Sequence, residues 1–108
     1  MYRFQRWRDA LSIAPDAITV ERLMRDYSAS IAPELVGTLP NDCQRALVSI
    51  RDGGSDVQTV AVTLLHVELS VRGDGEASKL LHELAHTFAS ASVRISRLRA
   101  EMPSRAAE

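Results

Sequence analysis

Apolar residues recur at steps of three and four through most of the chain, which is the spacing of one helix face. Prolines and glycines interrupt the pattern, and the expected helices cover the residues up to 14, about 19–32, 41–51, 57–71 and about 76–100. The broken stretch between Pro33 and Pro40 fits one tight helical turn. The sequence therefore predicts an all-α fold, a single compact bundle of about five helices.

The last expected helix has the clearest periodicity. Its apolar positions step by four, three, four, three, four and three residues: Ala77, Leu81, Leu84, Phe88, Ala91, Ile95 and Leu98. A short connector, Gly73-Asp74-Gly75, separates it from helix 57–71, so we expect an antiparallel hairpin of two long helices. A helix over residues 76–100 is roughly 37 Å long at 1.5 Å per residue, which is more than the preceding helix can cover.

Residues 57–71 are rich in β-branched side chains, which raises a strand as an alternative. Strict alternation fails, however, and the apolar residues step by three, four, three and four: Val57, Val60, Leu64, Val67 and Val71. A helix is therefore expected here too. Polar residues at the helix starts suggest N-caps, namely Thr19, Asn41 and Ser55.

Composition and charge narrow the class of protein. Apolar residues make up 45% and charged residues 25%, and 13 basic against 14 acidic side chains leave a net charge of −1, which does not favour nucleic acid or an anionic membrane as a partner. Cys43 is the only cysteine, so neither an internal disulfide nor a Cys-rich zinc site is expected. We expect one helical domain over residues 1–101, a flexible tail over 102–108, no membrane span and a cytoplasmic location.

The segment His82-Glu83-Leu84-Ala85-His86 matches the HExxH pattern and in these five residues resembles the zincin metallopeptidases. Two histidines four apart project from the same side of a helix, so both imidazoles can bind one zinc ion. The resemblance implies that His82 and His86 are ligands and that Glu83 is the general base toward a zinc-bound water.

The third ligand is the weak point of this hypothesis. A metzincin-like extension needs Gly at position 89 and His at position 92, where the chain has Ala89 and Ser92. Glu68 is the best remaining candidate, because it lies on the apolar side of its helix and the hairpin brings it near His82. A zinc-dependent hydrolase that uses Glu68, His82, Glu83 and His86 is therefore the alternative function.

The favoured expectation for the same segment is simpler. Both histidines lie partly exposed on a solvated helix face, Glu83 pairs with Lys79 one turn away, and the protein has no cofactor. Two imidazoles turned toward a shared acidic neighbour inside a crevice would instead favour the zinc peptidase hypothesis.

The far end of the last helix indicates a partner. Its apolar pattern continues through Ile95 and Leu98, beyond the reach of the preceding helix, and Arg94 and Arg97 flank it. Seams of this spacing are used in helix association, so these four residues form a candidate surface for a protein partner or a second copy. Alternatively, an N-terminal face of Phe4, Trp7 and Leu11 covers this end within one chain. The sequence favours a small non-catalytic protein that acts through protein–protein interaction, including self-association.

Overall fold

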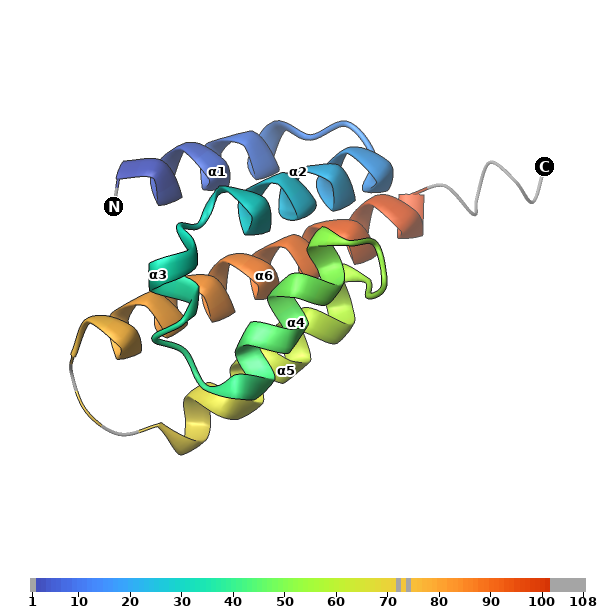
Figure 1. The fold of residues 1–108 in the computed structure, drawn as a ribbon. Helices are drawn as coiled ribbons and strands as arrows, with labels where there is room; N and C mark the ends of the chain where they lie inside the picture. The colour runs from blue at the N-terminus through green and yellow to red at the C-terminus, as the bar shows by residue number, and fades with distance from the viewer. Residues whose placement is uncertain (1, 72, 74, 102–108) are drawn as a thin grey trace.

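The computed structural model describes residues 2–71, 73 and 75–101, with side chains from residue 6 onward. This part of the chain forms six α-helices and no strand. The helices are α1 (Tyr2–Ile13), α2 (Ala17–Ser30), α3 (Pro33–Val36), α4 (Asn41–Arg51), α5 (Val57–Ser70) and α6 (Glu76–Glu101) (Figure 1). The predicted all-α fold is confirmed. The sixth helix is α3, the single turn that fills the Pro33–Pro40 stretch.

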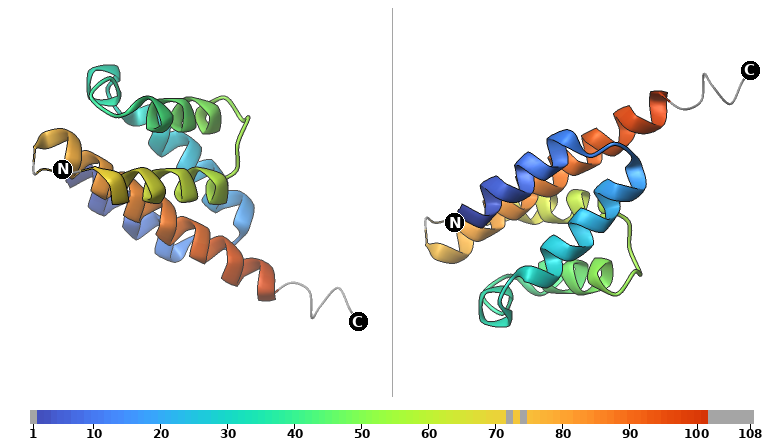
Figure 2. Two further views of the ribbon diagram at one scale, coloured as in Figure 1. Left: turned by 90° about the horizontal axis from the view of Figure 1, so that it is seen from below. Right: turned by 90° about the horizontal axis from the view of Figure 1, so that it is seen from above.

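The long helix α6 is the centre of the bundle. It packs against α5 as the second arm of the predicted antiparallel hairpin, and α1 and α2 pack against it from another side. Helix α4 bridges α2 and α5 and so closes a ring of four helices. Figure 2 shows α1 running alongside α6, with both helices pointing the same way. None of the described helices is long and apolar enough to cross a bilayer.

The apolar stripe of α6 forms the middle of the core. Leu84, Phe88 and Ala91 have no exposed surface, as their spacing predicts. Helices α1 and α2 supply the rings that meet this stripe. Trp7 packs edge-on against Tyr27 with ring centroids 5.6 Å apart, and Tyr27 lies 5.9 Å from Phe88. Aromatic pairs at this spacing add to the stability that burial provides.

The far end of α6 is also covered within one chain. Ile95 and Leu98 are only 6% and 8% exposed and belong to the same core as Leu11 and Met24. Both side chains are therefore buried within one chain and offer little surface to a partner. The side chain of Phe4 and the predicted tail over 102–108 lie outside the described residues.

All three predicted caps differ from the structure. Asn41 is the first residue of α4, whose N-cap position is Pro40 and has no side-chain hydrogen bond. Asp16 caps α2, and its carboxylate accepts a hydrogen bond of 2.8 Å from the backbone N–H of Thr19, the residue predicted as the cap. Asp56 caps α5 in the same way through Thr59, at 2.8 Å, in place of Ser55. Each aspartate lies three residues before the backbone N–H that donates to it, and this is the geometry of an N-cap.

Candidate metal centre

The α5–α6 hairpin places an acid from one helix opposite two histidines of the next. Glu68 follows Leu64 by one turn on the side of α5 that packs on α6, so its carboxylate points along that interface. The turn between the helices includes Gly73, whose φ of 114° strains any residue with a side chain. This tight connection sets the last turn of α5 beside the first turns of α6.

Glu68, His82 and His86 form one cluster. The ring N–H at Nδ1 of His82 donates a hydrogen bond of 2.5 Å to Oε2 of Glu68, and Nε2 of His86 lies 3.6 Å from Oε1. The two imidazole centroids are 4.1 Å apart. One ligand atom from each residue lies within 4.8 Å of the other two. The prediction that the hairpin brings Glu68 to His82 is confirmed, and both rings share this acidic neighbour.

The spacing of these atoms is close to that of a metal site. Ligand atoms at 2.0–2.2 Å from a tetrahedral zinc ion lie about 3.3 Å from one another. The ligand atoms of the cluster lie within 4.8 Å of one another, somewhat farther apart than this spacing. The side chains of His82 and His86 are 58% and 55% exposed and that of Glu68 is 24% exposed, so the cluster opens to solvent on one side. Three protein ligands and an open position are therefore available.

Glu83 lies apart from this cluster. It is turned about 80° around α6 from the mid-line of the two histidines and forms an ion pair with Arg8 of α1. Lys79, its expected partner, lies 3.9 Å from Glu76 instead. The predicted pairing of Glu83 with Lys79 is therefore wrong. The guanidinium of Arg8 holds the Glu83 carboxylate toward α1, away from a water that a metal on the histidines would bind.

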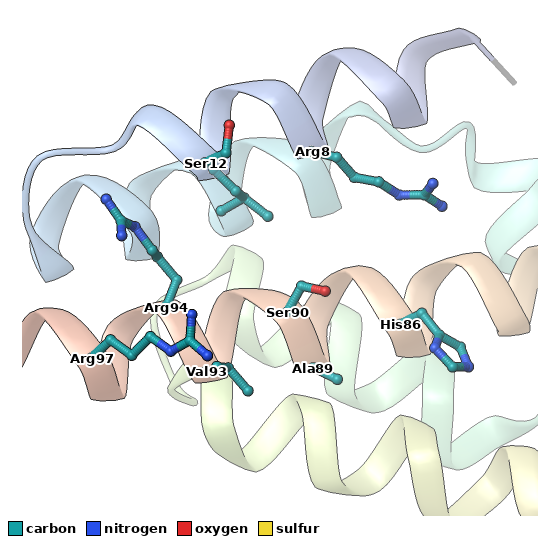
Figure 3. A pocket seen from close by; sticks show the side chains of 9 residues that line it. Arg8, Ser12, His86, Ala89, Ser90, Val93, Arg94 and Arg97 are labelled. Atoms are coloured by element: carbon teal, nitrogen blue, oxygen red, sulfur yellow. The ribbon is translucent and has the colours of Figure 1, made fainter.

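The four residues of the predicted partner surface divide between two environments. Ile95 and Leu98 are buried, whereas Arg94 and Arg97 line an open groove between α1 and α6 (Figure 3). Arg94 donates a hydrogen bond of 2.8 Å to the backbone carbonyl of Ala14, which joins α6 to the end of α1. Arg8 lines the same groove, a role that sequence reasoning missed because it depends on how α1 packs.

Cys43 plays no part in either region. Its side chain is fully buried in α4, and burial raises the pKa of its thiol to about 11. A thiol with a raised pKa is a poor nucleophile. The residue therefore packs as a small apolar side chain.

No family model, curated protein or solved structure matches this chain. The geometry and chemistry of its own residues therefore carry the functional argument.

Proposed function

We propose that this protein binds a divalent transition metal, zinc foremost, through Glu68, His82 and His86. The observation that carries the proposal is the convergence of three ligand atoms from two helices within 4.8 Å. Each side chain comes from a regular helix, and the hairpin that joins the helices is short. The ligands are thus held near one another before any metal arrives, which lowers the ordering cost of binding.

The donor set favours zinc over the common hard cations. Two imidazole nitrogens and one carboxylate form a set that zinc accepts with three protein ligands and one water. Calcium and magnesium prefer oxygen ligands alone. Zinc also binds nitrogen ligands more tightly than manganese or ferrous iron in the usual order of affinities. We therefore expect the site to bind zinc and not magnesium.

The proposed role of the metal is to clamp the hairpin without hydrolysis. A zinc ion on these ligands joins the last turn of α5 to the first turns of α6, on the rim of a core that is already packed. A hydrolytic site also requires a general base near the metal-bound water. The carboxylate of Glu83 is committed to Arg8, so no hydrolytic step is proposed.

Calorimetric titration of the purified chain with zinc chloride, after removal of metals with EDTA, tests this proposal. We expect one zinc per chain and no binding of magnesium under the same conditions. His82→Ala, His86→Ala and Glu68→Gln should each weaken zinc binding at least tenfold, since even residues behind the ligands contribute that much. His66→Ala is the matched control, because His66 is exposed on α5 outside the cluster.

Two outcomes would contradict metal binding at this cluster. One is the absence of heat or of bound zinc at stoichiometric concentrations. The other is equal loss of binding in the His66→Ala control and the cluster variants, which indicates adventitious binding to exposed histidines. Because imidazoles must lose their protons to bind metal, affinity should also fall as the solution is acidified.

A second candidate function is self-association through α5. Val62 and Leu69, two turns apart on the same face of this helix, are 60% and 79% exposed. The only charged residue of α5 is Glu68, which turns toward the histidines. Exposed Gln58 and His66 lie beside these two residues, and a face without a fixed charge can contact its own copy across a two-fold axis. Light scattering of the chain and of Leu69→Asp tests this, with dissociation of a dimer in the variant as the expected result and a monomeric parent chain as the contrary one.

A further inference from the structure

The groove between α1 and α6 is the second chemically distinctive surface of the molecule. Its volume is about 480 Å³, which lies in the range of small-molecule sites. Figure 3 shows Arg94 and Arg97 at one end, Arg8 and His86 at the other, and Ala89 and Val93 along α6 between them. Leu11 of α1 contributes a further apolar side chain. The groove thus has basic residues at both ends and, between them, these apolar side chains together with the hydroxyls of Ser12 and Ser90.

The charges at the Arg94 end are not neutralised by the protein. Arg94 is bound to the carbonyl of Ala14, which is uncharged, and its Nε is buried without a hydrogen-bond partner in the described part of the chain. A buried donor without a partner is costly and uncommon. No acid of the described residues forms an ion pair with Arg97. Arg94 and Arg97, one turn apart, both line this end of the groove, and neither forms an ion pair with an acid of the described residues.

The other basic end is different. Arg8 is paired with Glu83, so its charge is largely balanced, and His86 belongs to the metal cluster. An anionic group therefore gains most at the Arg94–Arg97 end. From Arg94, the groove continues along Val93 and Ala89 to His86, about two turns of α6, which suits an uncharged body rather than a second charge.

We propose that this groove binds an organic anion that consists of an apolar chain with a terminal carboxylate or phosphate. The anionic group lies between Arg94 and Arg97, where planar guanidinium groups match its oxygens. The apolar chain covers Val93, Ala89 and Leu11. The groove shares His86 with the metal cluster, but the residues proposed to bind the anionic group lie more than two turns beyond His86 on α6.

Titration by two-dimensional NMR with octanoate, in EDTA, tests the proposal through the methyl signals of Val93 and Leu11. Octyl phosphate serves as the second anionic probe, and comparison of the two identifies the preferred head group. Octanol and octylammonium have the same chain without the negative charge. We expect both anions to shift these signals in a saturable way and the neutral and cationic probes to bind at least tenfold more weakly.

Variants of Arg97 distinguish the contribution of its charge from that of its side-chain packing. Arg97→Ala should weaken octanoate binding at least tenfold, and Arg97→Lys should recover part of the loss because it restores the charge. Arg25→Ala, on the exposed face of α2 away from the groove, is the control and should leave binding unchanged. Thermal unfolding followed by circular dichroism verifies that each variant is folded.

The proposal is overturned if octanol binds as tightly as octanoate, which indicates an unspecific apolar surface, or if Arg97→Ala binds octanoate as the parent chain does. Absence of any saturable shift with either anion also overturns it. Repeating the titration with zinc present distinguishes the two proposals. Failure of zinc binding leaves the expected octanoate result in EDTA unchanged.

Discussion

One exposed face of α6 carries two groups of residues at the same helical spacing, and each group lies beside a different helix. We call these groups the first and second halves of the flank. His82 and His86 belong to the first half, and Val93 and Arg97 continue the same row in the second half. The first half meets Glu68 of α5, whose carboxylate draws both imidazoles together. The second half stays open beside α1. The chemistry of a helix face therefore depends on the helix packed next to it as much as on its own residues.

Both halves depend on the same core, so the largest expected effect removes them together. Phe88 lies on the buried side of α6 between the two halves and has no exposed surface. Phe88→Ala should lower the free energy of unfolding by about 3–5 kcal/mol, because it leaves a cavity among packed side chains. Urea unfolding measures this. Val93→Ala, at a residue that is 51% exposed, should cost about 0.5 kcal/mol or less, and equal losses would contradict this account of the core.

Zinc should stabilise the whole fold through the residues of the first half alone, whichever residue stands at position 97. A ligand that binds only the folded chain raises the free energy of unfolding by about 2.7 kcal/mol at a free concentration of one hundred times Kd. We expect this gain in the parent chain and in Arg97→Ala, and its loss in His82→Ala. Urea unfolding with and without zinc measures it. A gain that persists in His82→Ala would place the metal elsewhere.

Asp16 and Asp56 cap α2 and α5 and do not contact the two halves of the flank on α6. The Thr19 and Thr59 side chains, followed by their backbone N–H groups, hold the pKa values of Asp16 and Asp56 below the ordinary value of 3.8. The stability from these caps is therefore complete above pH 3.8 and is lost as the pH falls through the lower folded-state pKa values. Asp56→Ala should cost about 1 kcal/mol at neutral pH.

Asparagine at the same positions separates the cap from its charge. Asp16→Asn and Asp56→Asn keep the cap oxygen, so we expect near-parental stability at neutral pH and a flatter stability profile between pH 5 and pH 2. Thermal unfolding across this range measures the profile. An unchanged acid slope in the double variant would show that other carboxylates are responsible.

The smallest expected effect concerns the Arg8–Glu83 pair at the border between the two halves. Its side chains are 41% and 33% exposed, and pairs in such surroundings contribute at most about 1 kcal/mol. A double-mutant cycle with Arg8→Ala and Glu83→Gln should give a coupling of this size that decreases with added salt. A larger coupling that is insensitive to salt would show that the pair is shielded from solvent.

The features predicted from sequence are those that depend on neighbours along the chain. The steps of three and four in residues 76–100 predict both α6 and its buried stripe. The short connector around Gly73 predicts the hairpin, and the hairpin predicts that Glu68 approaches His82. Each of these inferences spans fewer than thirty residues. Local helix and hairpin geometry is therefore enough to predict that Glu68 lies near His82.

The features that sequence reasoning missed depend on contacts between distant parts of the chain. Arg8 and Glu83 are separated by 75 positions, and nothing in the local pattern of either indicates the other. The groove exists only because α1 packs along α6, and the burial of Ile95 and Leu98 also depends on other helices of the core. The cap at Asp16 was missed for a different reason. Asp16 and Thr19 are both good capping residues, and only the backbone conformation decides between them.

The hydrogen bond from Arg94 to Ala14 spans 80 positions and has a consequence for how the chain is synthesised. Helix α1 packs on α2 and α6, so Leu11 must wait for the last helix to leave the ribosome before its burial is complete. During translation the first helices carry uncovered apolar side chains, and such surfaces are prone to aggregate or to bind chaperones. The emergence of α6, rather than the early appearance of the first helices, is therefore the step at which this bundle closes.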